Sequence, residues 1–182
     1  MTEITAKLNL ERLLKKAGDG DLEAMTGAAL VLVKENRSGS EEVFKRAFEL
    51  YLQAAQGGFT TAQYNLGCMY MDGLGVERDC ISAWHWLKEA ADAGDYDAQF
   101  SLAILCEGGL AGPVDLQAAR QWYKKAAENG SGRAQYDLAC IYLHGKGVAV
   151  DRAQALVWFE QAAKSGVSRA NTYLQQLSKE CN

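Results

Sequence analysis

The amino-acid sequence repeats itself every 36 residues, and this period constrains the fold more than any other feature. The residues that share the step are single alanines (Ala62, Ala98, Ala134, Ala170), alanine pairs (Ala54-Ala55, Ala90-Ala91, Ala126-Ala127, Ala162-Ala163), glycines (Gly58, Gly94, Gly130, Gly166), tryptophans (Trp86, Trp122, Trp158) and aspartates (Asp79, Asp115, Asp151). A step kept by several residue types indicates a repeat protein, in which each unit packs on its neighbours.

Each repeat predicts two helices. In the first helix, Ala62, Leu66 and Met69 stand at positions i, i+4 and i+7, which lie on one face of an α-helix. A small residue follows the leucine in every unit, namely Gly67, Ala103 and Ala139. Small side chains at this position predict that a neighbouring helix approaches closely.

The second helix is predicted to begin at the periodic aspartate, because its carboxylate can accept hydrogen bonds from free backbone N–H groups. Ala83, Trp86 and Leu87 give it an apolar face, and Gly94 is predicted to end it in the left-handed conformation. Between the two helices, a Gly-x-Gly-Val turn over residues 73–76 uses glycine where positive φ values are needed.

Two repeats depart from this pattern. In the turn of residues 95–130, Ala111 and Gly112 replace the expected glycine and valine, so we predict a loop of equal length and different shape. The unit at 21–58 lacks the glycine turn, and its step from Ala24 to Ala62 is 38 residues. We therefore predict two extra residues within 36–40.

Residues 1–182 are predicted to form a single domain. Its predicted parts are an N-terminal half-repeat helix (1–20), a degenerate repeat (21–58), three full repeats (59–94, 95–130 and 131–166) and a C-terminal capping helix (167–182). Capping elements are expected because the terminal units of a solenoid must cover exposed packing surfaces.

The repeat at residues 59–94 reads Ala62-x3-Leu66-Gly67-x2-Tyr70-x2-Gly73-x-Gly75-Val76-x2-Asp79-x3-Ala83-x2-Trp86-x3-Ala90-Ala91-x2-Gly94. This pattern resembles the Sel-one-like repeat, a relative of the tetratricopeptide repeat. Residues 131–166 match at the same positions. The resemblance implies an all-α fold, an α/α solenoid of stacked antiparallel helix pairs. It also implies a protein-binding role, with the first helices lining a concave face.

By position, the resemblance assigns partner-binding residues to that face. They are Thr61, Tyr64, Cys68, Met71 and Asp72 in one repeat, Asp97, Phe100, Ile104, Glu107 and Gly108 in the next, and Arg133, Tyr136, Cys140, Leu143 and His144 in the third. Large aromatic residues are favoured anchors in interfaces, so the row of Tyr64, Phe100 and Tyr136 either binds a partner or packs neighbouring helices.

Composition bears on which classes of partner the protein can have. The net charge of −4 and the lack of a basic run argue against nucleic acid. No segment approaches the roughly 20 apolar residues of a membrane span. The start of the chain lacks a signal peptide's apolar stretch, which predicts a cytoplasmic protein, although a secreted or periplasmic chain without its signal would look the same.

The spacing of the five cysteines, Cys68, Cys80, Cys106, Cys140 and Cys181, fits neither a disulfide framework nor a metal site, so reduced thiols are expected. The two histidines, His85 and His144, have no companion at metal-ligand or nucleophile spacing. Carboxylates such as Glu107 could pair across repeats. We predict no catalytic residues, no metal and no cofactor.

The leading hypothesis is a non-catalytic adaptor or scaffold that binds a protein or peptide. A narrower alternative is a bacterial immunity or inhibitor protein that neutralises a toxin, a role that members of the resembling family serve. An enzyme or redox protein is the third reading. The oligomeric state and the identity of the partner stay open.

Overall fold

The structure, a computed structural model, describes residues 3–36 and 39–180, and within these ranges the chain forms ten α-helices and no strand. The chain divides into two compact units, Met1–Ala93 and Gly94–Asn182. The first unit contains α1 (Glu3–Gly18), α2 (Leu22–Glu35), α3 (Glu41–Gln56), α4 (Thr60–Asp72) and α5 (Cys80–Asp92). The second contains α6 (Tyr96–Gly108), α7 (Leu116–Glu128), α8 (Gly132–His144), α9 (Arg152–Lys164) and α10 (Ser168–Glu180).

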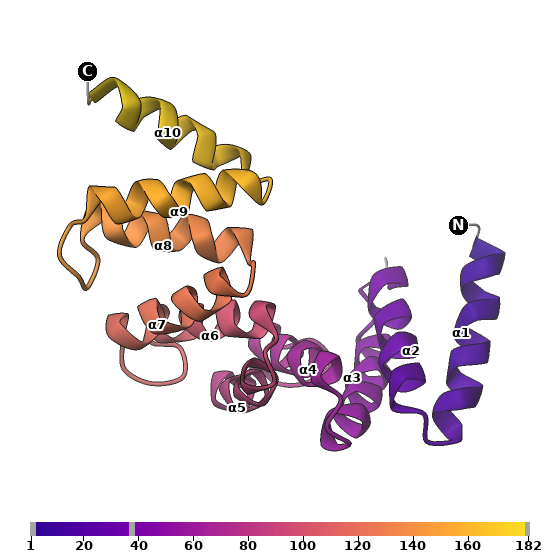
Figure 1. The fold of residues 1–182 in the computed structure, drawn as a ribbon. Coiled ribbons are helices and arrows are strands. Elements are labelled where there is room, and N and C mark those ends of the chain that lie inside the picture. The colour runs from indigo at the N-terminus through magenta and orange to yellow at the C-terminus, as the bar shows by residue number, and fades with distance from the viewer. Residues whose placement is uncertain (1–2, 37–38, 181–182) are drawn as a thin grey trace. The chain divides into compact units, whose positions relative to one another are not determined.

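Within each unit, consecutive helices pack side by side (Figure 1). The pairs α2/α3 and α4/α5 are repeats of the first unit, and α6/α7 and α8/α9 are repeats of the second. The all-α prediction of stacked helix pairs is confirmed. Over the described ranges, no helix combines the length and the apolar character needed to cross a membrane. The prediction of one domain over residues 1–182 stays a prediction.

The periodic alanines form the packing surfaces, as their spacing predicts. Ala62, Ala98, Ala134 and Ala170 are all fully buried. The alanine pairs are buried as well, apart from the half-buried Ala163. The periodic tryptophans differ from expectation, because each is only half-buried, and the residue that follows it is the buried one (Leu87, Tyr123, Phe159).

We expect Ala162→Leu to lower the free energy of unfolding by about 1–3 kcal/mol, because Ala162 is fully buried in a cluster with Ala139 and Ala170 and has no room for a larger side chain. Chemical denaturation measures the change. Ala153→Leu is the matched control, since Ala153 is exposed on the same helix. If both variants unfold at the same denaturant concentration, the alanines do not hold the helices together.

The helix ends follow the predicted chemistry. The carboxylate oxygen Oδ1 of Asp79 accepts a hydrogen bond from the backbone N–H of Ile81 at 2.9 Å. Asp115 and Asp151 begin α7 and α9 in the same way, with Oδ1 2.9 Å from the backbone nitrogens of Ala118 and Gln154. Gly94, Gly130 and Gly166 follow the helix ends with φ values of 96°, 95° and 86°, and these caps are confirmed.

The turns between paired helices also behave as predicted, with one correction. Gly75 has a φ of 69°, but no non-glycine residue in the described ranges has a positive φ, so the turn at Ala111 takes a different shape. The two extra residues of 21–58 do not lie within 36–40. Instead, they lie in the helices: α2 and α3 have 14 and 16 residues, against 13 in each of α4 and α5, while the segment between α2 and α3 is two residues shorter than the one between α4 and α5. Arg37 and Ser38 lie outside the described residues.

Buried glutamines tie successive repeats together, a feature that the sequence reasoning missed. The side-chain amide Nε2 of Gln135 donates to the backbone carbonyl of Ala127 at 3.1 Å, and Gln63 reaches Ala55 at 3.5 Å. Each glutamine lies on a first helix, and each carbonyl belongs to the alanine pair of the repeat before it. Buried polar groups need such partners, so these amides help to fix how the repeats stack.

Candidate functional site

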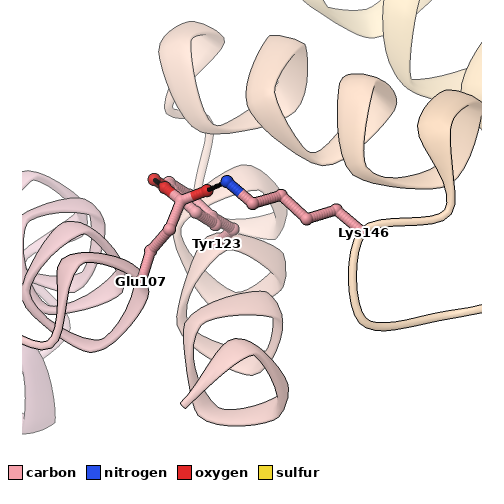
Figure 2. Close-up of polar contacts among 3 residues, drawn as sticks. All are labelled: Glu107, Tyr123 and Lys146. Atoms are coloured by element: carbon pink, nitrogen blue, oxygen red, sulfur yellow. Dashed lines mark hydrogen bonds and ion pairs between the residues drawn. The ribbon is translucent and has the colours of Figure 1, made fainter. Parts of the chain in front are cut away.

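Glu107 is the centre of a polar cluster in the second unit. It lies near the end of α6, where Tyr123 of α7 donates its hydroxyl hydrogen to Oε2 at 2.8 Å. Lys146, in the turn after α8, forms an ion pair with Oε1 (Figure 2). The carboxylate therefore joins two repeats.

A pocket of about 300 Å³ opens beside this cluster. Its walls come from the end of α6, from α7, from the middle and end of α8 and from the turn that follows α8. The lining residues are Glu107, Tyr123, Asp137, Cys140, Ile141, His144 and Lys146. Three of these, Glu107, Cys140 and His144, belong to the predicted partner-binding set. All of the lining residues lie in one compact unit, so the pocket's geometry is defined within it.

The polar cluster occupies positions that are apolar in the neighbouring repeats. At the position of Glu107, the neighbouring repeats have Met71 and Leu143. At the position of Tyr123, they have Leu87 and Phe159, which are both fully buried. The repeat fold itself therefore requires neither the carboxylate nor the hydroxyl, and their presence here indicates a local role.

Lys146 reaches the cluster because of the glycine turn. Gly145 and Gly147 flank it with φ values of 70° and 68°, which only glycine adopts at low cost. The equivalent positions in the other repeats hold Leu74 and Leu110. The lysine side chain is 52% exposed and the Glu107 side chain 28% exposed, so the cation lies at the rim and the carboxylate lies deeper.

The pKa values follow from these contacts. Burial raises the pKa of Glu107, but the hydrogen bonds from Lys146 and Tyr123, together with the lysine charge, outweigh burial and hold the pKa below its usual range. Burial and the hydrogen bond to Glu107 raise the pKa of the Tyr123 hydroxyl. Tyr123 therefore stays protonated and Glu107 stays ionised near neutral pH.

Asp137 is the second carboxylate of the pocket, and over residues 3–36 and 39–180 it has no hydrogen bonds that would lower its pKa. Burial and then the negative charge of Glu107 raise its pKa, and the charge of Arg133 only partly opposes them. Among the described residues, none donates a hydrogen bond to the Asp137 carboxylate. A partly buried carboxylate without a hydrogen-bond donor destabilises the folded state when it is ionised.

We expect Asp137→Asn to raise the free energy of unfolding at pH 7. The folded-state pKa of Asp137 lies above the unfolded value, so the folded chain holds this proton more tightly. Stability from this group therefore rises as the pH falls from neutral through the folded-state pKa, and the variant loses that dependence. Denaturation by urea over a series of pH values measures both effects.

Glu107→Gln is the matched control for Asp137→Asn, because the pKa shift of Glu107 has the opposite sign and the expected change in unfolding free energy is therefore opposite. The folded-state pKa of Glu107 is lowered, so its contribution is present above the unfolded pKa and is lost as the pH falls through the folded-state value. This variant should be less stable than the wild type at pH 7. If both variants change the free energy of unfolding at pH 7 in the same direction, the opposite pKa shifts of Asp137 and Glu107 are contradicted.

Three other predicted residues meet on the same face of the second unit. The guanidinium of Arg133 lies over the ring of Phe100, 4.5 Å from its centroid. Burial and Asp95 raise the pKa of Asp97, and the charge of Arg133 opposes them. Phe100 itself is only 6% exposed and packs edge to face on Tyr123 at 5.5 Å. Phe100 therefore serves packing and offers little surface to a partner.

Tyr136 packs against its own repeat and against the helix that follows it. Its ring lies edge to face against Phe159 at 5.7 Å and against Tyr173 at 6.0 Å. Burial, then Cys140 and Tyr173, raise the pKa of Tyr136 to about 12. Phe100 and Tyr136, the two members of the predicted aromatic row in this unit, therefore each pack against a second helix, α7 and α9.

The remaining predicted residues vary in exposure. In the second unit, Gly108, Arg133 and His144 are exposed, and Ile104, Cys140 and Leu143 are half-buried. In the first unit, Thr61 and Asp72 on α4 are exposed, and Tyr64, Cys68 and Met71 are half-buried. Their assignment to a partner-binding face stays a prediction.

The sequence reasoning missed Tyr123, Asp137 and Lys146. A signal was available, because each is a polar or charged departure from its own repeat position. The equivalents are Leu87 and Phe159 for Tyr123, Asn65 and Ser101 for Asp137, and Leu74 and Leu110 for Lys146. The predicted binding residues all lie on the outward face of the first helices, whereas Tyr123 lies on a second helix and Lys146 in a turn.

Cys68, Cys80, Cys106 and Cys140 are half-buried residues with reduced thiols, while Cys181 lies outside the described residues. Burial raises the pKa of the Cys106 and Cys140 thiols, which disfavours the nucleophilic thiolate. Over the part of the chain that the structure describes, no three His, Cys, Asp or Glu residues gather as metal ligands. The pocket itself shows charge pairing and hydrogen bonding, through Glu107, Tyr123 and Lys146.

Helix pairs repeated in tandem, with a polar pocket between two repeats, define a helical repeat protein of the solenoid class. A family model described as the Sel1 repeat matches residues 22–59, 60–95, 97–131 and 132–167. The chain belongs to the Sel1 repeat family. Proteins of this family are typically interaction modules, and their fold is generally a non-catalytic scaffold. None of the curated proteins matches the chain.

Solved structures show the same fold. A protective antigen present in uropathogenic Escherichia coli strains is 32% identical, with a TM-score of 0.79 over 86% of this chain, and this chain spans 33% of that protein. A Sel1 repeat protein from Oxalobacter formigenes is 28% identical, with a TM-score of 0.76 over 90% of this chain and 67% of the other. Cysteine-rich protein B of Helicobacter pylori, 22% identical, shares the fold, with a TM-score of 0.60 over 74% of this chain and 96% of that chain.

Proposed function

We propose that this chain is a non-catalytic protein-binding module that holds a protein or peptide partner on the first-helix face of α6 and α8, at the pocket beside Glu107. The observation that supports the proposal is a polar pocket at positions where the neighbouring repeats have apolar residues. Where this repeat has Glu107, the neighbouring repeats have Met71 and Leu143.

The chemistry of the pocket supports binding over catalysis. Lys146 neutralises Glu107, and the thiol of Cys140 is held in its protonated form. Exposed residues that surround the pocket, such as His144 and Arg133, can contact a partner without rearranging the core. Interface energy usually concentrates in a few such side chains around a central pocket.

The proposal is tested by affinity capture from the native host, followed by affinity measurement with the purified partner. His144→Ala should weaken binding by about fivefold or more, because an interface side chain of this kind contributes about 1 kcal/mol or more. His85→Ala is the matched control, since His85 is exposed on α5 and lies outside the pocket.

Equal affinities for the two histidine variants and the wild type would contradict the pocket as the binding site. The narrower prediction, a bacterial immunity or inhibitor protein that neutralises a toxin, stays a prediction. A captured partner that proves to be a toxin would support it.

A further inference from the structure

The pocket contains a carboxylate that the chain itself does not neutralise. Glu107 has two donors, Tyr123 and Lys146. Asp137 faces the same pocket and receives no hydrogen bond from the described residues. The pocket thus contains one carboxylate, Asp137, without a hydrogen-bond donor in the part of the chain that the structure describes.

A count of the facing charges gives the same result. Two carboxylates line the pocket, Glu107 on α6 and Asp137 on α8, against one lysine, Lys146, in the turn after α8. Arg133 on α8 and Asp97 on α6 lie outside the lining. Arg133 is shared, because its charge acts on both Asp97 and Asp137 and its guanidinium lies over Phe100. One positive charge is missing.

Lys146 indicates which chemical group fits. Its ammonium reaches Glu107 at the end of a long side chain (Figure 2). The lysine is exposed and stands between Gly145 and Gly147. Glu107 is the fixed member of the pair, because Tyr123 holds its other oxygen. An incoming cation can therefore replace the lysine without disturbing the carboxylate.

We propose that the pocket receives a lysine or arginine side chain of the partner, which pairs with Asp137 and competes with Lys146 for Glu107. This inference rests on the proposed function and adds the chemistry of the partner to it. A pocket of about 300 Å³ is at the lower end of the volumes in which proteins bind small ligands, which suits one side chain. A guanidinium would add a geometric match, because its fork pairs with a carboxylate through two hydrogen bonds.

The test uses the full chain labelled with ¹⁵N and a capped Gly-Arg-Gly peptide as the probe. A second peptide has citrulline in place of arginine, which keeps the shape and removes the charge. The arginine peptide should shift the backbone amide signals of Glu107, Asp137 and Lys146 along a saturating curve. The citrulline peptide, and sodium chloride at equal ionic strength, should not.

Three variants sharpen the result. Asp137→Asn should weaken binding of the arginine peptide by about tenfold or more, as expected for the loss of a charged hydrogen-bond acceptor. Lys146→Gln should strengthen it about two- to fivefold, because the competing ion pair is removed. Glu128→Gln, which removes an exposed carboxylate of α7 outside the pocket, should leave the affinity unchanged.

Three results would each overturn the inference. They are shifts of equal size with the citrulline peptide, unchanged affinity in Asp137→Asn, or weaker binding in Lys146→Gln. The last would mean that the lysine itself holds the ligand. The spectra also report whether each variant is folded, and Lys146→Gln alters only an exposed turn residue.

The two proposals can fail separately. If the purified partner depends on His144 but the arginine peptide does not bind, the protein-binding role stands and the basic ligand is refuted. If the arginine peptide binds at Asp137 but the partner is insensitive to His144, the pocket accepts cations and the proposed function fails.

Discussion

Replacing Gly75 with alanine is expected to lower the free energy of unfolding by about 3 kcal/mol or more, through two costs that add. Gly75 has a φ of 69°, in the left-handed region that a residue with a Cβ atom adopts only with strain. An added Cβ would also lie 2.4 Å from the backbone carbonyl carbon of Phe44, on α3. Backbone atoms of a packed helix cannot move aside as the end of a flexible side chain can.

Chemical denaturation of three glycine variants separates the two costs. Gly58→Ala is the matched control, because Gly58 has a φ of 83° and an added Cβ would meet no atom within 4 Å. That variant should lose only the strain, about 1–2 kcal/mol. In Gly147→Ala, the nearest atom would be the side-chain Cβ of Leu116 at 2.8 Å, so an intermediate loss is expected. Equal losses at Gly58 and Gly75 would contradict the predicted backbone overlap.

Phe159→Ala is expected to cost about 3–5 kcal/mol of unfolding free energy, the range for truncating a large buried aromatic side chain. Phe159 has no exposed surface, and its ring stacks on Tyr173 with centroids 4.9 Å apart and planes 7° from parallel. Tyr173 belongs to α10, so the variant should also loosen the attachment of that helix. Hydrogen exchange of the α10 amides, measured beside chemical denaturation, tests this second effect.

The matched control for Phe159→Ala comes from the repeat itself. Leu87 occupies the equivalent position on α5, where it is also fully buried. Phe159→Leu should therefore cost much less, about 1.5 kcal/mol or below, because it keeps most of the apolar volume. Equal losses for Phe159→Ala and Phe159→Leu would contradict the expected contribution of buried apolar volume at this position.

The fold could be predicted from the sequence because its determinants are local and repeated. The Asp79 cap, the Gly94 helix end and the Ala62 packing face each depend on residues a few positions apart. The same local rules identified the altered turn at Ala111. They misplaced the two extra residues of 21–58, because helix length in α2 and α3 is not marked by any turn residue.

The candidate site could be predicted only in part, because it depends on contacts between repeats. Glu107 and His144 were identified from their place on the first helices. Tyr123 and Lys146 meet Glu107 across 16 and 39 positions of the chain, and no local pattern reports such a distance. The orientation of Phe100 toward Tyr123 was likewise set by packing that the period alone does not reveal.

The glutamine ties have a consequence for how such a chain can change in evolution. Gln135 binds a backbone carbonyl, which every residue at that position would offer, so a duplicated or exchanged unit could form the same bond with any predecessor. The ion pair of Glu107 and Lys146 joins two particular side chains and has no such tolerance. The ion pair therefore requires that the repeats holding Glu107 and Lys146 stay adjacent and in order, whereas the glutamine bonds place no such limit on which repeats are joined.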